Sequence, residues 1–488
     1  MATLVLLFLF LSVRDSNSQE FNLFGEAGQA YAIEIQVGRP PQKLNVLVDT
    51  GSTTLAIASY ARQENDKYFY SKNSTSIYDT GKEVQAKYSQ GMWVGRLVSD
   101  VVMFPAEFPS IPEVRCDIAL ITKSHKFFMN GSGWQGLLGL AYLPVGAWGE
   151  NVVVESWLDS VDRKLKKPMS FQLKLCGPEN ATNATHYGRF EMLDDESKDA
   201  QDIMFRTPIL QKRWYEVGVI SIRVLSNNTS KPIDTDSMNV TSDKVYQDPD
   251  IDVCRKLNNE KSIVDSGTTN IRLPDTLFRQ VVDEIKSART SDMLVLDEFW
   301  YRGEAACWPE PQKWALPYIA IDLMSVDYDD QYFTLEIPHE NYVRLVTAHN
   351  TTGGNGSVSE FCYKLGIEAG GKETVLGYTA MEGLQVLFNR SAGWIGWKTS
   401  DCGPESRISG PYNASKSLIG LCKLKTPIAE VAVSIKAAQW ALCAVSIIAF
   451  GVLVYLLAPC VKLFFVKPMP SSPQISLSQA ALVDQETS

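Results

Sequence analysis

Short apolar stretches separated by Gly, Pro, Asn and Asp recur along most of the chain. Residues 31–37, 44–48 and 215–224 alternate or run continuously in the manner of β-strands. Two segments, 153–165 and 274–288, instead have the apolar spacing of amphipathic helices. The inward positions expected in these two helices are Val154, Trp157, Leu158, Val161, Leu165, Leu277, Phe278, Val281, Val282 and Ile285. The pattern predicts a mainly β protein with a few helices.

Both ends of the chain have a different hydrophobic pattern. Residues 4–11 are all apolar, and Ser16, Asn17 and Ser18 follow shortly after, which is typical of a secretory signal peptide over 1–18. A buried N-terminal strand is the alternative. Residues 437–461 carry no formally charged side chain and are long enough to cross about 30 Å of hydrocarbon. A buried helix of a soluble domain is disfavoured because no polar stripe interrupts this run.

Glycosylation sequons support one orientation of this predicted transmembrane helix. All of them precede it, and none follows: Asn73, Asn130, Asn180, Asn183, Asn227, Asn228, Asn239, Asn350, Asn355, Asn389 and Asn413. We therefore expect a single-pass type I membrane protein of the secretory pathway, in the endosome, the Golgi or at the cell surface. A juxtamembrane linker over 426–436 and a cytoplasmic tail over 462–488 complete this topology.

The chain also contains a weak internal repeat. Residues 44–54 resemble residues 261–270, and each copy is followed downstream by an apolar-apolar-Gly element, at 137–139 and at 375–377. Two copies of one plan predict two lobes related by pseudo-twofold symmetry. We place the N-terminal lobe at 19–205 and the C-terminal lobe at 206–425, both contributing to one catalytic site.

Composition excludes some classes of function. The formal net charge of −10 argues against nucleic acid as a partner. The four histidines are not spaced as metal ligands and the cysteines form no Cys-x-x-Cys motif, so neither a metal site nor a cofactor is expected.

The repeated segment carries the candidate chemistry. Asp49 and Asp265 each end an apolar strand and are followed by a hydroxyl residue, a glycine and a second hydroxyl residue. A carboxyl group at the end of an apolar strand is partly desolvated, which raises its pKa. The neighbouring hydroxyl groups can orient it by hydrogen bonding. If two such turns face one another, the carboxyl groups share one proton and can activate a water molecule. The pattern indicates paired-carboxyl hydrolysis.

Three other interpretations were weighed. A single Asp-Thr-Gly is usually a turn after a strand, but two copies in matched contexts favour catalysis. A non-enzymatic receptor on a protease-like scaffold should have lost part of the acid pair, and both members are present. A serine or cysteine hydrolase is disfavoured because no Gly-x-Ser-x-Gly motif occurs and histidine is scarce.

The segments 48–52 and 264–268 resemble the two active-site motifs of pepsin-like aspartic proteases. Residues 262–274, 127–142 and 37–42 further resemble the β-secretase (memapsin) subfamily, and matching blocks span about 25–422. The resemblance implies a bilobal pepsin-like fold and a membrane-anchored aspartic endopeptidase. Its partners would be polypeptide substrates, including membrane or secreted proteins, and the lipid bilayer.

The resemblance also implies roles for individual residues. Asp49 and Asp265 would be catalytic. Arg272 would line the cleft and favour polar or acidic substrate side chains, with a surface arginine at a strand edge as the alternative. Tyr88 and Trp93 would belong to a flap, with an ordinary hairpin as the alternative. The residues expected to support the acid pair are Thr50, Gly51, Ser52, Ser266, Gly267 and Thr268. Those expected to bind substrate are Tyr88, Trp93, Trp134, Thr269, Asn270 and Arg272.

Six cysteines match the subfamily, although their spacing alone leaves fifteen connectivities open. The resemblance implies the disulfides Cys176–Cys402, Cys254–Cys422 and Cys307–Cys362. Cys116 is expected to be a buried free thiol. Cys443 falls within the predicted transmembrane helix, and Cys460 lies where palmitoylation occurs, with an inert cysteine as the alternative.

The sequence departs from the subfamily at three places. Only about twenty residues precede the first matching block near Gly25, so a propeptide is not evident. The subfamily's Phe-Asp-Arg is Phe388-Asn389-Arg390 here, which removes a charge and creates a sequon. The tail lacks an evident acidic dileucine signal.

Overall fold

The computed structural model describes residues 21–25, 30–63, 66–88, 91–105, 111–128, 133–142, 154–178, 184–193, 205–225, 248–288, 295–353, 356–425 and 435–465. The predicted signal peptide lies outside these ranges, as do most of the predicted tail and linker. The sequons outside them are Asn130, Asn180, Asn183, Asn227, Asn228, Asn239 and Asn355.

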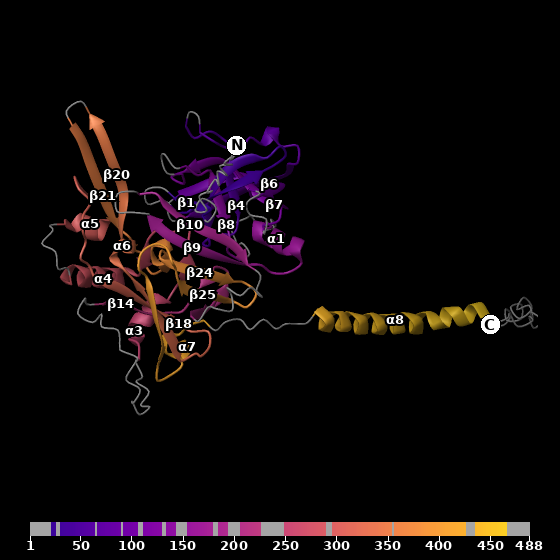
Figure 1. Cartoon of the computed structure of the whole chain (residues 1–488). Helices are drawn as coiled ribbons and strands as arrows, with labels where there is room; N and C mark the ends of the chain where they lie inside the picture. Colours follow the sequence, from indigo (N-terminus) through magenta and orange to yellow (C-terminus); the bar gives the residue numbers. More distant parts are fainter. Residues whose placement is uncertain are drawn as a thin grey trace, which may run out of the picture. The chain divides into compact units, whose positions relative to one another are not determined.

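The chain forms two compact units, residues 1–428 and 429–488. The first holds every strand of the described chain, and the second holds helix α8 (Ile435–Phe465) (Figure 1). Among the described residues, no helix combines the length and the apolarity that crossing a membrane requires. The transmembrane helix over 437–461 and the lobe boundary at 205/206 therefore stay predictions.

The mainly β architecture predicted from the sequence is confirmed. The largest sheet of the described chain has 13 strands in the order β11-β25-β24-β9-β10-β1-β2-β3-β8-β4-β7-β6-β5. Their bounds are β1 (Leu23–Gly25), β2 (Ala32–Val37), β3 (Gln42–Asp49), β4 (Leu55–Ala58), β5 (Tyr78–Tyr88), β6 (Gly91–Met103), β7 (Val114–His125), β8 (Gly136–Gly139), β9 (Ser170–Pro178), β10 (His186–Leu193), β11 (Phe205–Pro208), β24 (Leu384–Asn389) and β25 (Trp394–Thr399). Strands from near the C-terminus thus complete a sheet that the N-terminal half begins.

Three smaller sheets contain the remaining strands. Their orders are β12-β13-β15-β23-β16-β22, β14-β18-β19-β26 and β17-β21-β20. The bounds are β12 (Gln211–Lys212), β13 (Tyr215–Glu216), β14 (Val219–Leu225), β15 (Ser262–Asp265), β16 (Ile271–Leu273), β17 (Ala306–Trp308), β18 (Tyr318–Met324), β19 (Gln331–Ile337), β20 (Val343–Gly353), β21 (Gly356–Leu365), β22 (Ile367–Ala369), β23 (Thr374–Gly377) and β26 (Arg407–Asn413).

The internal repeat has a direct counterpart in strand pairing. β3 runs parallel to β8, with Asp49 opposite Gly139, and β15 runs parallel to β23, with Asp265 opposite Gly377. In each copy the next strand, β4 or β16, pairs antiparallel with that partner and parallel with a further strand. The same strand plan therefore presents each aspartate at the end of its strand.

Helices are few, as predicted. Those of the first unit that lie within the described residues are α1 (Trp157–Leu165), α3 (Ile251–Leu257), α4 (Asp275–Ser287), α5 (Asp297–Arg302), α6 (His339–Tyr342) and α7 (Leu418–Cys422), with 3₁₀ turns at Ser71–Asn73 and Tyr378–Ala380. Helix α4 buries all five expected apolar residues. Helix α1 begins later than 153 because the Ser156 side chain accepts a 3.0 Å hydrogen bond from the Asp159 N–H and caps it.

Two local predictions were wrong. Residues 215–224 do not form one strand, because the chain changes sheets: β13 pairs with β12 and β15, whereas β14 pairs with β18. Leu165 does not pack inward, since 36% of its surface is exposed at the end of α1. The alternation of strands and the apolar spacing of helices predict burial only while the element keeps one face against the core.

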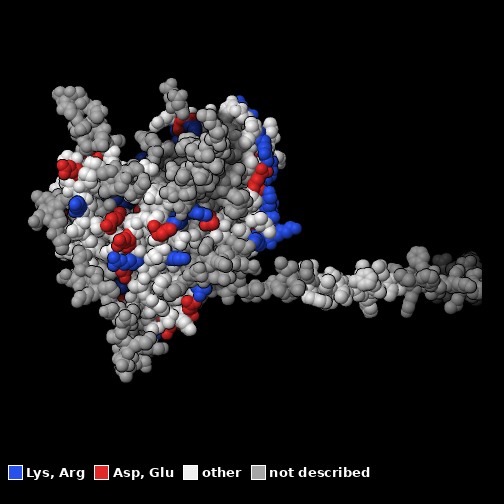
Figure 2. Space-filling model, viewed as in Figure 1, with Lys and Arg blue, Asp and Glu red and all other residues white. Residues whose placement is uncertain are grey.

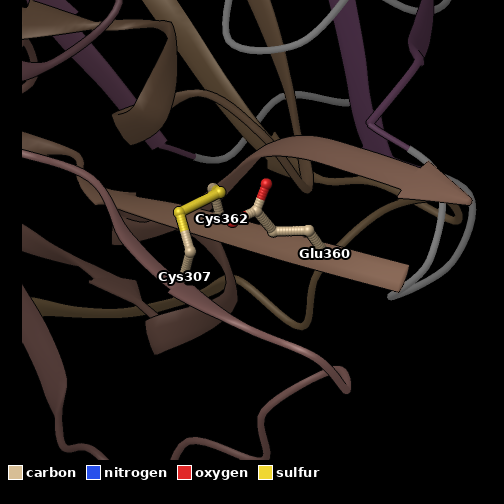
Figure 3. A group of neighbouring side chains, drawn as sticks. All are labelled: Cys307, Glu360 and Cys362. Atoms are coloured by element: carbon tan, nitrogen blue, oxygen red, sulfur yellow. A yellow bond between two sulfur atoms is a disulfide. The ribbon is translucent and has the colours of Figure 1, made fainter. Parts of the chain in front are cut away.

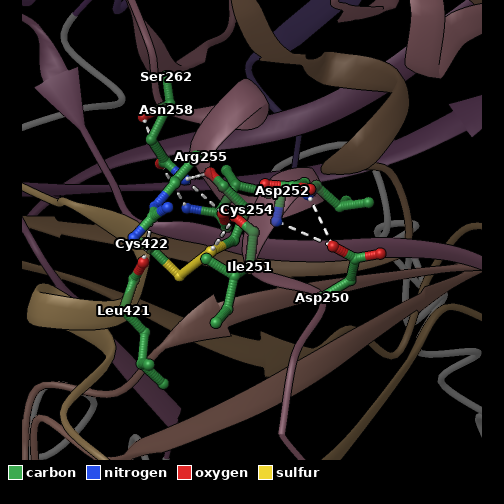
Figure 4. Close-up of a disulfide and its surroundings, with 11 residues drawn as sticks. Asp250, Ile251, Asp252, Cys254, Arg255, Asn258, Ser262, Leu421 and Cys422 are labelled. Atoms are coloured by element: carbon green, nitrogen blue, oxygen red, sulfur yellow. Dashed lines mark hydrogen bonds between the residues drawn. A yellow bond between two sulfur atoms is a disulfide. The ribbon is translucent and has the colours of Figure 1, made fainter.

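Three disulfides tie the described chain together, and they are the three pairs that the resemblance implies: Cys176–Cys402, Cys254–Cys422 and Cys307–Cys362. Cys254 lies in α3 and Cys422 ends α7, so their disulfide joins these helices (Figure 4). Arg255 reinforces the joint by donating a hydrogen bond of 3.1 Å to the Leu421 carbonyl. Cys116 is a buried free thiol, and burial raises its pKa.

The sequons within the described residues differ in exposure. Asn73 is exposed and Asn413 is partly buried. Asn389 is buried, and its side-chain oxygen accepts hydrogen bonds from the Ala392 N–H and the Ser391 hydroxyl. Asn389 therefore shapes the turn between β24 and β25.

Candidate active site

Two loops bring the predicted acid pair together. A Cβ added to Gly51 would lie 2.5 Å from the carboxyl carbon of Asp265, and one added to Gly267 would overlap the carboxylate of Asp49. Real Cβ atoms do not approach so closely, so glycine is needed where each loop passes the opposite carboxyl group. The structure therefore places Asp49 and Asp265 face to face.

The residues after the two aspartates lock the loops to one another. The Thr50 hydroxyl donates to the Val264 carbonyl at 3.0 Å and accepts from the Ser266 N–H at 2.9 Å. The Ser266 hydroxyl donates to the Val48 carbonyl at 2.7 Å and accepts from the Thr50 N–H at 3.1 Å. Both side chains are buried. Each loop thus satisfies the backbone of the other, which fixes the distance between the carboxyl groups.

Matched donors orient the two carboxyl groups. Asp49 accepts from the Gly51 N–H at 2.8 Å and from the Ser52 hydroxyl. Asp265 accepts from the Gly267 N–H at 2.9 Å and from the Thr268 hydroxyl at 2.7 Å. Because each carboxyl group has one backbone and one hydroxyl donor, neither can rotate without losing both hydrogen bonds.

Burial changes the acidity of the pair. Only 5% of the Asp49 surface is exposed, and this burial raises its pKa well above the usual range. The negative charge of Asp265 raises it further, as does a hydrogen bond between the two carboxyl groups. Hydrogen bonds from Ser52 and Gly51 act in the opposite direction. The pair therefore resists losing its last proton.

The predicted flap is the hairpin formed by β5 and β6. Tyr88 ends β5 opposite Gly91. Burial and then the charge of Asp49 raise the pKa of Tyr88, so the phenol stays protonated. The polar groups of Trp93 and Ser52 act in the opposite direction and lower the pKa of this phenol. Tyr88 thereby connects the hairpin to the hydroxyl that binds Asp49.

Aromatic side chains pack beside this hairpin. The Phe127 ring lies 5.3 Å from the Tyr88 ring and 5.9 Å from the Trp134 ring, measured between centroids. Only 4% of the Trp134 surface is exposed, and it also packs against Phe128. Trp134 thus packs against Phe127 and Phe128, whereas Tyr88 lies nearer to Asp49.

The other predicted substrate-binding residues follow Asp265 directly. Thr269, Asn270 and Arg272 are all partly buried. The Asn270 amide donates to Glu368 at 2.8 Å, and Arg272 forms an ion pair of 3.1 Å with the same carboxylate. The sequence analysis missed Glu368, because only the pairing of β16 with β22 brings it beside Arg272.

One group of residues within the described ranges has the proximity of metal ligands: Cys307, Glu360 and Cys362 (Figure 3). The two sulfur atoms are joined in a disulfide, so they offer no thiolate to a metal.

On the face shown in Figure 2, acidic and basic side chains are mixed over the centre of the molecule, and basic ones gather at one edge. Charge alone does not mark a binding surface at the centre of this face.

Comparison with known proteins gives a consistent result. The family model described as eukaryotic aspartyl protease matches residues 30–399. Beta-secretase of Strongylocentrotus purpuratus is 31% identical over 422 residues, which cover 82% of this chain and 72% of that protein. Vacuolar protease A of Aspergillus fumigatus is 26% identical over 260 residues, covering 52% of this chain and 56% of that protein. Chymosin of Ovis aries is 28% identical over 138 residues, covering 26% and 35%.

The family match runs through both acid-bearing loops and both copies of the strand plan. This chain therefore belongs to the eukaryotic aspartyl protease family and is a pepsin-like aspartic endopeptidase.

Proposed function

We propose that this endopeptidase uses Asp49 and Asp265 as its catalytic dyad. The observation that carries the proposal is the pair of interlocked loops, in which each glycine lies against the opposite carboxyl group. Two carboxyl groups held this closely cannot both ionise readily, so one proton remains between them at acidic pH. One member is then a base while the other is an acid.

The proposed reaction needs no group beyond these two carboxyls and a water molecule. The ionised carboxylate takes a proton from water, whose oxygen bonds to the carbonyl carbon of the substrate. The protonated carboxyl gives its proton to the carbonyl oxygen, which produces a tetrahedral diol. When the C–N bond breaks, the nitrogen takes a proton from the first carboxyl group, and a diol hydroxyl returns a proton to the second. The dyad ends as it began.

The substrate would lie between the dyad and the flap. Tyr88 would cover the scissile bond, because it already reaches Ser52 beside Asp49. Trp93 would hold Tyr88 in place, and Trp134 would support Tyr88 through the Phe127 ring that packs against both. Thr269, Asn270 and Arg272 would form the opposite wall, since they follow the loop that carries Asp265.

We further propose that the enzyme is anchored in a membrane and cleaves membrane or secreted proteins, as a β-secretase-like protease. The support is the uncharged run over 437–461, which falls within helix α8, and the signal-like segment over 1–18. The described part of α8 also exposes large apolar side chains, including Val445, Ile448 and Phe450. A helix exposing such residues favours lipid over water.

Peptide cleavage measured across pH tests the dyad. We expect wild-type activity to peak at acidic pH and to fall as pH rises through the raised pKa of Asp49, because the second ionisation removes the acid. Activity should also fall at still lower pH, where both carboxyl groups are protonated. The measurement is kcat/KM for a peptide library from pH 3 to pH 8. A profile flat from pH 5 to pH 8 would contradict a shared-proton dyad.

Membrane anchoring has a separate test. The full-length chain expressed in cells should remain with membranes after alkaline carbonate washing, because a helix spanning hydrocarbon is not removed by breaking ionic contacts. A chain ending at Lys425 should be released. Release of the full-length chain by carbonate would exclude the proposed anchor and leave the proposed dyad intact.

A further inference from the structure

Glu368 lies against Arg272, which the resemblance suggests would favour polar or acidic substrate side chains. We propose that Glu368 is a specificity-determining residue: it neutralises Arg272, so this part of the cleft selects an uncharged substrate side chain over an acidic one. The inference rests on the proposed function and reverses the charge preference expected from Arg272 alone.

The strand register places the two side chains together. β16 runs parallel to β22, and Arg272 is the direct partner of Glu368. Directly paired residues of neighbouring strands point to the same face of a sheet. The Arg272 Nε lies 3.1 Å from one Glu368 carboxylate oxygen, while the other oxygen accepts a 2.8 Å hydrogen bond from Asn270. One carboxylate thus holds two of the predicted substrate-binding residues.

This pair is connected to the dyad. Asn270 lies two residues beyond Thr268, whose hydroxyl donates to Asp265 at 2.7 Å. The Thr268 carbonyl in turn accepts a hydrogen bond from the Tyr378 N–H, which fixes the backbone between the dyad and Asn270. Glu368 therefore contacts the segment 269–272, which directly follows the loop that carries Asp265.

The pair is also accessible. The side chains of Arg272 and Glu368 are 21% and 34% exposed, so a substrate side chain can approach both charges. Within the described residues, neither takes part in another ion pair. An approaching carboxylate would find the guanidinium already paired and would be repelled by Glu368. A neutral side chain meets no such repulsion.

Removing the Glu368 charge should change the preference between acidic and neutral substrate side chains. Glu368→Gln keeps the size of the side chain and leaves Arg272 free to bind an acidic substrate group. We expect the ratio of kcat/KM for Glu-containing over Gln-containing peptides to rise roughly fivefold at one substrate position, as suits a partly exposed charge pair. Arg272→Gln should act in the opposite direction, lowering that ratio and favouring Lys.

The experiment uses the purified full-length chain and peptides that differ only by Glu, Gln or Lys at each position around the scissile bond. Glu304→Gln is the matched control, because it removes the same charge from an exposed residue of the C-terminal half. The expected result is a change in the Glu/Gln ratio at one position for Glu368→Gln and none for Glu304→Gln. Cooperative thermal unfolding of every variant, followed by circular dichroism, would show that each is folded.

Two results would overturn the inference. Unchanged ratios in Glu368→Gln, with wild type cleaving normally, would remove the role of Glu368 and leave the proposed function standing. Equal changes in Glu368→Gln and Glu304→Gln would show a general effect of net charge and also reject it. If wild type cleaves none of the peptides, the proposed function fails, and the inference fails with it.

Discussion

Replacing Asp49 with asparagine is expected to lower kcat/KM for peptide hydrolysis by a factor on the order of 10²–10⁴, the contribution of positioned acid–base groups. The amide is nearly the same size, its oxygen can still accept from the Gly51 N–H, and its nitrogen can donate to the Ser52 oxygen, but it cannot exchange a proton with water or substrate. The measurement is steady-state cleavage at the acidic optimum of the wild type.

Two further measurements separate lost chemistry from lost structure. Asp100→Asn is a matched control, because Asp100 is equally buried but bonds Ser74 and Ser76. Any loss of activity in this control should be a small fraction of that in Asp49→Asn. Comparable losses in both would mean that the effect comes from removing any buried carboxylate.

The raised pKa of Asp49 also predicts a gain in stability for Asp49→Asn. An unfolded aspartate has a pKa near about 3.9, so ionising Asp49 in the folded protein costs free energy as pH rises through its raised value. Asparagine carries no such cost. The variant should therefore unfold at a higher temperature than wild type at pH 7, and at a similar temperature below about pH 3.9, where the carboxyl stays protonated in both states.

Replacing Arg344 with methionine is expected to destabilise the folded chain by roughly 3–5 kcal/mol at neutral pH, the range for removing one partner of a buried charge pair. Arg344 is 6% exposed and donates to the Tyr378 hydroxyl at 2.5 Å and to the Thr379 hydroxyl at 3.1 Å. Its charge also offsets that of Glu382, which is 2% exposed and accepts a 2.8 Å hydrogen bond from Tyr31.

The destabilisation should depend on pH. Burial raises the pKa of Glu382, and Arg344 partly lowers it again. Without Arg344 the folded-state pKa rises further, so more stability is lost as pH increases through it. Thermal unfolding should show a larger difference between wild type and variant at pH 7 than at pH 4.

A second substitution tests the cause of this effect. Glu382→Gln, added to Arg344→Met, should restore part of the lost stability at pH 7, because it removes the unpaired buried charge. If the double variant is less stable than Arg344→Met by the full cost of Glu382→Gln alone, the two charges do not interact.

The acid pair was the part of the candidate site most accessible to prediction, because its information is local. Each aspartate, its glycine and its two hydroxyl residues lie within four consecutive positions, and the second copy repeats them. The amphipathic faces of α1 and α4 were predictable for the same reason, apart from the exposed end at Leu165.

Residues brought together by distant strands were not predictable in this way. Glu368 stands in no recognisable motif, and its role depends on β22 aligning with β16. Arg344, Tyr378 and Glu382 lie near Tyr31 only because the C-terminal half packs against the residue that precedes β2. Pairings of this kind depend on register over long separations, which the local pattern of polar and apolar residues does not specify.

The completion of the N-terminal sheet by β24 has a consequence for biosynthesis. β24 pairs with β9, and the Thr50 and Ser266 hydroxyls each need the opposite loop as a partner. A ribosome-bound chain that has not yet released residues 384–389 therefore lacks part of the scaffold behind its first aspartate. Proteolytic competence would therefore arise only after these C-terminal residues have emerged, so the nascent chain would be spared from cutting itself during synthesis.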